Sequence, residues 1–115
     1  MESLESLKVK LSEFVNEREW EKFHSPKNLA MALSAEAGEL LEIFQWLTEE
    51  QSKNLNPEQL SAAADELADI QIYLIMLFDQ LGLDPIKESH RKLECNKAKY
   101  PVSKAKGNSQ KYTNL

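Results

Sequence analysis

Cysteine and glycine are scarce in this chain, and both shortages exclude classes of protein. The 115 residues include one cysteine, Cys95, which leaves no basis for a disulfide framework or a cysteine metal site. Three glycines and four prolines leave little room for a loop-rich β fold. No apolar run approaches the roughly 20 residues that a membrane span needs. The N-terminus lacks a basic-then-apolar signal pattern, so we expect a cytoplasmic protein with no membrane partner.

Positive charge is scarce in the first three quarters of the chain. Residues 1–85 carry 6 basic and 17 acidic side chains, a net charge of −11, whereas residues 86–115 carry 8 and 2, a net charge of +6. The total of −5 argues against a dedicated binder of nucleic-acid polymers. The basic end is either a solvated tail or a segment that faces phosphate groups above an acidic metal site.

Helical periodicity covers most of the chain and predicts an all-α fold. Apolar residues at helical spacing predict a first helix over about residues 3–22. The pairs Ser25-Pro26, Asn56-Pro57 and Asp84-Pro85 each combine an N-cap residue with a proline suited to the first turn. They predict further helices over about 26–47, 57–81 and 85–99, with a polar connection at 48–56.

These four helices predict a four-helix bundle-like protomer. We expect one helical domain over residues 1–101 and a polar, basic C-terminal tail over 102–115. Residues 67–81 are apolar nearly all the way round the third helix. Such a helix is usually central or lies in an oligomer interface, so we expect an oligomer.

Two acidic pairs lie on consecutive predicted helices. Glu36 and Glu39 are three residues apart on the second helix, and Glu66 and Asp69 have the same spacing on the third. Residues at this spacing share a helix face. If the two helices pack antiparallel, four carboxylates meet, and they repel one another unless a cation neutralises them. Hard oxygen ligands of this kind suit Mg²⁺, or alternatively Mn²⁺.

Surface charge and a di-iron centre are the alternatives to this site. Both acidic pairs adjoin apolar residues, which is unusual for a merely solvated charged face. Helical di-iron centres normally use Glu-x-x-His pairs, and neither His24 nor His90 stands in that spacing. The sequence therefore favours Mg²⁺ over iron, and ordinary surface charge remains open.

Aromatic side chains recur near the acidic pairs. Trp46 falls seven residues after Glu39, and Tyr73 falls seven after Glu66. Seven residues are about two helical turns, so each ring lies near the stripe of its acidic pair. Trp20 is expected at the end of the first helix. Such rings either stack a nucleobase, for about 1–3 kcal/mol each, or belong to the core.

The fourth helix carries a basic face. Lys92, Asn96 and Lys99 follow one another at spacings of four and three residues, so they share one side of the helix. Lysine is a usual point-charge partner for phosphate. The alternative is plain surface charge.

The ordered set of motifs resembles the all-α NTP pyrophosphatase superfamily of MazG-like enzymes, and within it the dCTP pyrophosphatase branch. The stretches that carry the likeness are EREW at 17–20, FHSPKNL at 23–29, EAGEL at 36–40, FQW at 44–46, DELADI at 65–70, KYP at 99–101 and KYT at 111–113, with Tyr73 and Asn96. Two positions depart from the pattern. Ala35 stands where MazG-type members often have a second glutamate, and Leu11 stands where the animal dCTP enzymes carry a histidine.

The resemblance implies a Mg²⁺-dependent enzyme that hydrolyses a (d)NTP to the (d)NMP and diphosphate, with dCTP or a modified nucleotide preferred, in nucleotide-pool sanitation. It implies a homodimer or homotetramer whose sites draw on more than one subunit. It implies Glu36, Glu39, Glu66 and Asp69 as metal ligands, with Glu39 and Glu36 as catalytic candidates. The implied substrate-binding residues are Trp20, Trp46, Tyr73, Lys92, Asn96, Lys99 and Tyr100. A nucleotide sensor without turnover and a helical scaffold are the alternatives.

Overall fold

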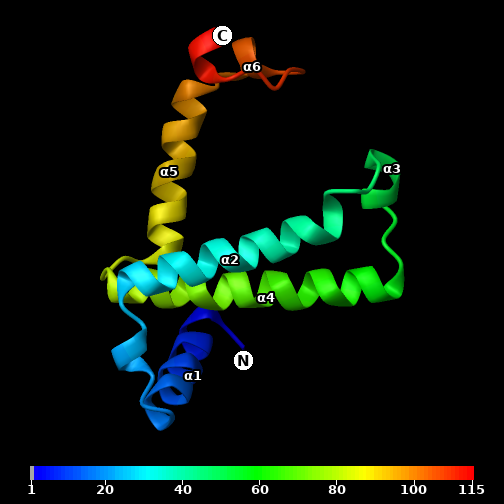
Figure 1. Cartoon of the computed structure of the whole chain (residues 1–115). Helices are drawn as coiled ribbons and strands as arrows, with labels where there is room; N and C mark the ends of the chain where they lie inside the picture. Colours follow the sequence, from blue (N-terminus) through cyan, green and yellow to red (C-terminus); the bar gives the residue numbers. More distant parts are fainter. Residues whose placement is uncertain (1) are drawn as a thin grey trace. The chain divides into compact units, whose positions relative to one another are not determined.

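The computed structural model describes residues 2–115 and confirms the all-α fold (Figure 1). Its elements are α1 (Leu4–Glu17), the 3-10 turn η1 (Glu21–Phe23), α2 (Pro26–Phe44), α3 (Glu49–Ser52), α4 (Pro57–Gln80), α5 (Pro85–Lys99), α6 (Val102–Ala105) and the 3-10 turn η2 (Tyr112–Asn114). The chain divides into two compact units, a first one that ends at Gly82 and a second one, Leu83–Leu115. Within residues 2–115, no helix combines the length and the apolar character needed to cross a bilayer.

The first unit is built on an antiparallel pair of helices. α2 packs along α4, and α1 packs against α4 (Figure 1). The buried apolar core is small and consists of Leu29 from α2 with Ala63 and Ile75 from α4. Because the pair is antiparallel, the middle of α2 lies beside the middle of α4. That arrangement brings the two acidic pairs into neighbouring positions.

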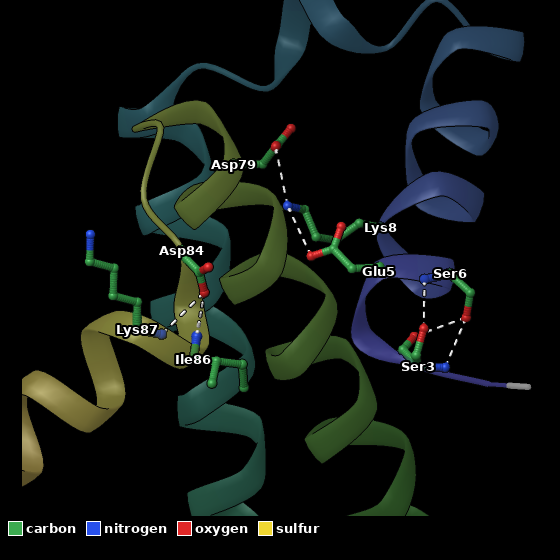
Figure 2. Close-up of polar contacts among 8 residues, drawn as sticks. All are labelled: Ser3, Glu5, Ser6, Lys8, Asp79, Asp84, Ile86 and Lys87. Atoms are coloured by element: carbon green, nitrogen blue, oxygen red, sulfur yellow. Dashed lines mark hydrogen bonds and ion pairs between the residues drawn. The ribbon is translucent and has the colours of Figure 1, made fainter.

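Local capping explains where the long helices begin. The Ser25 hydroxyl accepts a hydrogen bond from the Asn28 N–H at 3.2 Å, and the Asn56 side chain accepts one from the Gln59 N–H at 2.8 Å. In α5, one carboxylate oxygen of Asp84 accepts from the N–H groups of Ile86 and Lys87 at 2.9 and 3.1 Å (Figure 2). A proline follows each cap in the first turn. These three predicted helix starts are confirmed.

α1 is shorter than predicted and ends at Glu17 rather than near residue 22. Glu19 adopts a positive φ of 54°, the left-handed conformation that stops the helix. The N–H of Glu19 donates to the Asn16 carbonyl at 3.1 Å, and the N–H of Trp20 donates to the Val15 carbonyl at 3.0 Å. Glycine usually occupies this position, so the glutamate at position 19 does not indicate the end of the helix.

Polar contacts join α1 to α4. The Lys8 ammonium lies 3.9 Å from the Glu5 carboxylate and 4.0 Å from that of Asp79 on α4 (Figure 2). Ser3 and Ser6 form a capping box at the start of the helix (Figure 2). The two carboxylates are exposed, so the ion pairs stabilise the packing only weakly.

Two further boundaries differ from the prediction. α2 ends at Phe44 rather than near residue 47. The connection over 48–56 contains the single-turn helix α3, because Thr48 and Gln51 form a capping box there.

The second unit consists of α5 and the segment that follows it. Residues 102–115, expected as a polar tail, form α6 and η2. The Tyr112 ring lies 6.0 Å from the Tyr100 ring at an interplanar angle of 82°, and the Lys99 ammonium lies 4.8 Å from the centroid of Tyr112. The chain therefore folds back on the C-terminal end of α5, with Tyr112 as the point of contact.

Candidate functional site

Three glutamates from α2 and α4 converge in the first unit. Glu36, Glu39 and Glu66 each offer a carboxylate oxygen that lies within 4.8 Å of the other two. The Oε2 atoms of Glu36 and Glu66 are buried and have no hydrogen-bond partner. Buried carboxylate oxygens without a donor are unfavourable unless a proton or a cation satisfies them. The cluster is therefore built to hold positive charge.

The cluster changes the acidity of one member. The pKa of Glu66 is raised to about 7 from its ordinary value of 4.5. The largest cause of the raised pKa is the neighbouring Glu36 carboxyl, to which a protonated Glu66 can donate, followed by burial, and then by the Glu39 carboxyl and the negative charge of both neighbours. A shared proton thus offsets the repulsion below about pH 7, and a cation can take its place above that pH.

The donor set fits a hard divalent cation. All three groups are carboxylates, and oxygen ligands of this type suit Mg²⁺ and Mn²⁺. Mg²⁺ is usually bound through few carboxylates together with water and substrate phosphates. The two buried oxygens without partners provide an independent reason for a cation at this place.

Asp69, the fourth expected ligand, lies outside this cluster. It is exposed and follows Glu66 by three residues on α4, which turns it about 60° around the helix axis. It lines a pocket formed with α1 instead. The sequence predicted that four carboxylates meet, and the structure brings three together with Asp69 as a neighbour.

An aromatic pocket of about 420 Å³ lies between α1 and α4, and its α4 residues follow Glu66 along that helix. Trp20 and Tyr73, both expected to hold a base, line this pocket together with Asp69. The remaining lining residues are Lys10, Leu11, Phe14, Val15, His24, Ile72 and Met76. Trp20 is 41% exposed, so part of its ring is accessible to a ligand. α4 therefore carries both Glu66 of the carboxylate cluster and part of the pocket wall.

Two pocket residues escaped the sequence reasoning. Helical spacing indicates only that Phe14 is an apolar residue of the first helix, and the spacing of His24 gives it no role. His24 lines the pocket, and its Nδ1 atom is buried without a hydrogen-bond partner. The only signal in the sequence was their closeness along the chain to Trp20.

Trp46 is not brought to this pocket. It follows α2 and is 86% exposed. An indole ring is rarely left so open in a folded chain, because burying an aromatic ring is strongly favourable.

The expected phosphate-binding residues lie on and just after α5, in the second unit. Lys92 and Lys99 are exposed and Asn96 is half-buried, while Tyr100 caps the helix. Among the described residues, neither of these lysines forms an ion pair, whereas Arg91 and Lys97 pair with Glu88 and Glu94 at 3.0 Å. The two lysines are therefore available to another anion. The sequence reasoning did not find Tyr112, whose ring contacts Lys99.

Comparisons with known proteins find relatives over most of the chain. The MazG-like family profile matches residues 31–115. The chain is 39% identical to dCTP pyrophosphatase 1 of Bos taurus and 38% identical to that of Homo sapiens, and each alignment covers 98% of this chain and 68% of the relative. A crystal structure of a pyrophosphatase from Archaeoglobus fulgidus is similar with a TM-score of 0.82 at 40% identity, over 88% of this chain and 94% of that one.

The all-α fold, the carboxylate cluster and these relatives together define the class: the protein is an enzyme, a hydrolase of the pyrophosphatase type. Within that class, the chain belongs to the MazG-like family. The resemblance inferred from the sequence motifs is thereby confirmed.

Proposed function

We propose that this chain is a Mg²⁺-dependent nucleoside triphosphate pyrophosphohydrolase that prefers dCTP or a modified nucleotide. It takes one water per (d)NTP, cleaves the bond between the α- and β-phosphates, and releases the (d)NMP and diphosphate. The observation that carries the proposal is the cluster of Glu36, Glu39 and Glu66, together with an aromatic pocket that is lined by the same helix, α4. The mammalian relatives named dCTP pyrophosphatase 1 support the choice of bond and base.

The carboxylates have distinct roles in this proposal. Glu36, Glu39 and Glu66 would hold Mg²⁺, or Mn²⁺, and Asp69 would join them from the pocket side. The bound cation supplies positive charge for the triphosphate oxygens. Glu39 is the most exposed of the three clustered glutamates, so its carboxylate accepts the proton of the attacking water. Glu36 would hold the cation close to Glu39.

The pocket holds the nucleoside. Trp20 and Tyr73 contact the base, because both line the cavity and a nucleobase stacks on any accessible aromatic face. Leu11 also lines the pocket and offers neither a donor nor an acceptor. Base selection therefore depends on the polar groups of the other lining residues.

The second unit binds the phosphates. Lys92 and Lys99 offset the charge that develops on the departing diphosphate, and Asn96 and Tyr100 donate hydrogen bonds to phosphate or sugar oxygens. The absence of ion pairs at these two lysines, within the described residues, supports this assignment.

The enzyme acts as a homodimer or homotetramer in this proposal. Large apolar side chains of α2 and α4 are exposed, among them Met31, Leu41, Leu60 and Leu67. Exposed apolar surface of this kind is typical of an association surface. Trp46, open to solvent in one chain, would complete the nucleotide pocket of another copy.

The direct test is to incubate the protein with each dNTP and rNTP, with and without Mg²⁺, and to separate the products by chromatography. We expect monophosphate and diphosphate in equal amounts, only with the cation, and fastest for a cytosine nucleotide or a modified one. Release of orthophosphate would contradict the choice of bond. Stabilisation by nucleotide and Mg²⁺ without product would identify a sensor, and no effect of either would identify a scaffold.

A further inference from the structure

The backbone of the loop that follows α1 reverses its direction at a strained residue, Glu19. Glu19 takes the left-handed conformation, which is costly for any residue other than glycine. The N–H groups of Glu19 and Trp20 nevertheless pair with the carbonyls of Asn16 and Val15. The reversal therefore returns the chain to the last turn of α1 and brings Trp20 back toward it.

Trp20 meets Phe14 at the end of this reversal. The two ring centroids are 5.6 Å apart and the rings are almost perpendicular, at 80°. On its other side Trp20 meets His24, with centroids 6.2 Å apart and an angle of 72°. Edge-to-face pairs of this kind are favourable and directional, so the orientation of each ring depends on its neighbours.

Arg18 holds Phe14 from outside the pocket. Its guanidinium carbon lies 3.8 Å from the centroid of the Phe14 ring, and its Nη1 group donates a hydrogen bond of 3.1 Å to the Phe14 carbonyl. A cation–π contact combined with a hydrogen bond fixes the guanidinium in one place. Arg18 is absent from the residues that line the pocket, whereas Phe14, Trp20 and His24 all line it.

We propose that Arg18 is a positioning residue for the nucleotide pocket. It fixes Phe14, which in turn sets the orientation of the Trp20 ring that contacts the base. This inference rests on the proposed function, because it takes Trp20 as a base-contacting group. In the sequence, Arg18 looks like an ordinary surface charge. Only its contact with Phe14, and the contact of Phe14 with Trp20, give it a role.

The same loop provides a matched control. Lys22 also lies over an aromatic ring, that of Phe23, with its ammonium 5.4 Å from the centroid. Phe23 does not line the pocket. Lys22→Ala therefore removes a cation and a cation–π contact from this loop and leaves the contacts among Arg18, Phe14 and Trp20 unchanged.

The experiment compares KM and kcat for the preferred nucleotide in Arg18→Ala, Lys22→Ala and Trp20→Ala. We expect Arg18→Ala to raise KM about 3- to 10-fold, in line with the loss of one cation–π contact, with kcat and melting temperature close to those of Lys22→Ala. Near-UV circular dichroism of the Trp20 band, recorded in a Trp46→Phe background, should change in Arg18→Ala and not in Lys22→Ala. Arg18→Gln replaces Arg18→Ala if the latter does not fold.

A double variant separates the possible failures. If Arg18 acts through Trp20, Arg18→Ala adds little to the KM of Trp20→Ala. Additive effects on KM would overturn the positioning role and leave the pocket intact. An unchanged KM in Arg18→Ala, with a raised KM in Trp20→Ala, would overturn this inference alone. An unchanged KM in Trp20→Ala would overturn the inference together with the proposed pocket.

Discussion

The two units of this chain differ in charge and in what their side chains can hold. The first unit carries 16 acidic and 6 basic side chains, and the second carries 3 and 8. In the first unit, Glu36 and Glu66 have buried oxygens without partners, which call for a cation. In the second, Lys99 rests on the Tyr112 ring without an ion pair among the described residues, which leaves its charge for an anion. The first unit therefore offers negative charge to a cation, and the second unit offers positive charge to an anion.

Removing one carboxylate of the cluster should give the largest effect. Glu36→Gln and Glu66→Gln keep the side-chain shape but delete a ligand charge, so we expect pyrophosphate release to fall at least about 100-fold. Glu42→Gln, on the same helix and outside the cluster, should retain activity. Steady-state assays at saturating Mg²⁺ measure the difference in rate. Equal rates in Glu36→Gln and Glu42→Gln would contradict the assignment of the catalytic site to the cluster.

Removing a phosphate-facing charge from the second unit should have a smaller effect. We expect Lys92→Ala and Lys99→Ala each to raise KM for the nucleotide about 5- to 10-fold, because each deletes one charge-assisted contact to phosphate. Lys97→Ala is the matched control, since Lys97 already pairs with Glu94. A KM for Lys97→Ala that rises as much as the other two would mean that only overall positive charge matters.

Protonation of the acidic unit should appear in its stability. The pKa of Glu66 is about 7 in the folded chain and 4.5 ordinarily, so the folded state binds this proton more tightly. The resulting stability is fully present below about pH 4.5 and is lost as the pH rises through about 7. We expect the melting temperature of the metal-free protein to fall over this range.

Mg²⁺ should reverse this loss at about pH 8, because the ligands bind it in their deprotonated form. Glu66→Gln serves as the control and should flatten the fall in melting temperature. A fall of the same size in that variant would assign the pH dependence to other groups.

The smallest effect should come from the strained turn after α1. Glu19→Gly removes the left-handed strain of a non-glycine residue, so we expect the free energy of unfolding to rise by about 1 kcal/mol. Urea denaturation measures this change. Asn16→Gly, in the last turn of the helix, should instead lower stability. Destabilisation by Glu19→Gly would mean that its side chain contributes more than the strain costs.

The parts of the fold that the sequence predicted correctly depend on neighbouring residues. The starts of α2, α4 and α5 follow from a cap and a proline that stand side by side in the chain. The meeting of Glu36, Glu39 and Glu66 follows from helical spacing and one antiparallel pairing.

The parts that the sequence did not predict depend on an unfavourable backbone conformation or on contacts between distant residues. Glu19 ends α1 in a conformation that no local preference favours. Asp69 lines a pocket with α1 because α1 packs against that side of α4, and no spacing within α4 encodes this packing. The Tyr112 ring contacts Lys99 only because the chain after α5 folds back on that helix.

The most direct test of the central claim is a titration of Mn²⁺ at about pH 8, above the pKa of about 7 of Glu66. Electron paramagnetic resonance measures the free ion. We expect the unaltered protein and Glu42→Gln to bind Mn²⁺ alike, and Glu36→Gln and Glu66→Gln to bind it at least about 10-fold more weakly. The same affinity in all four proteins would contradict the assignment of the cation to the glutamates of α2 and α4.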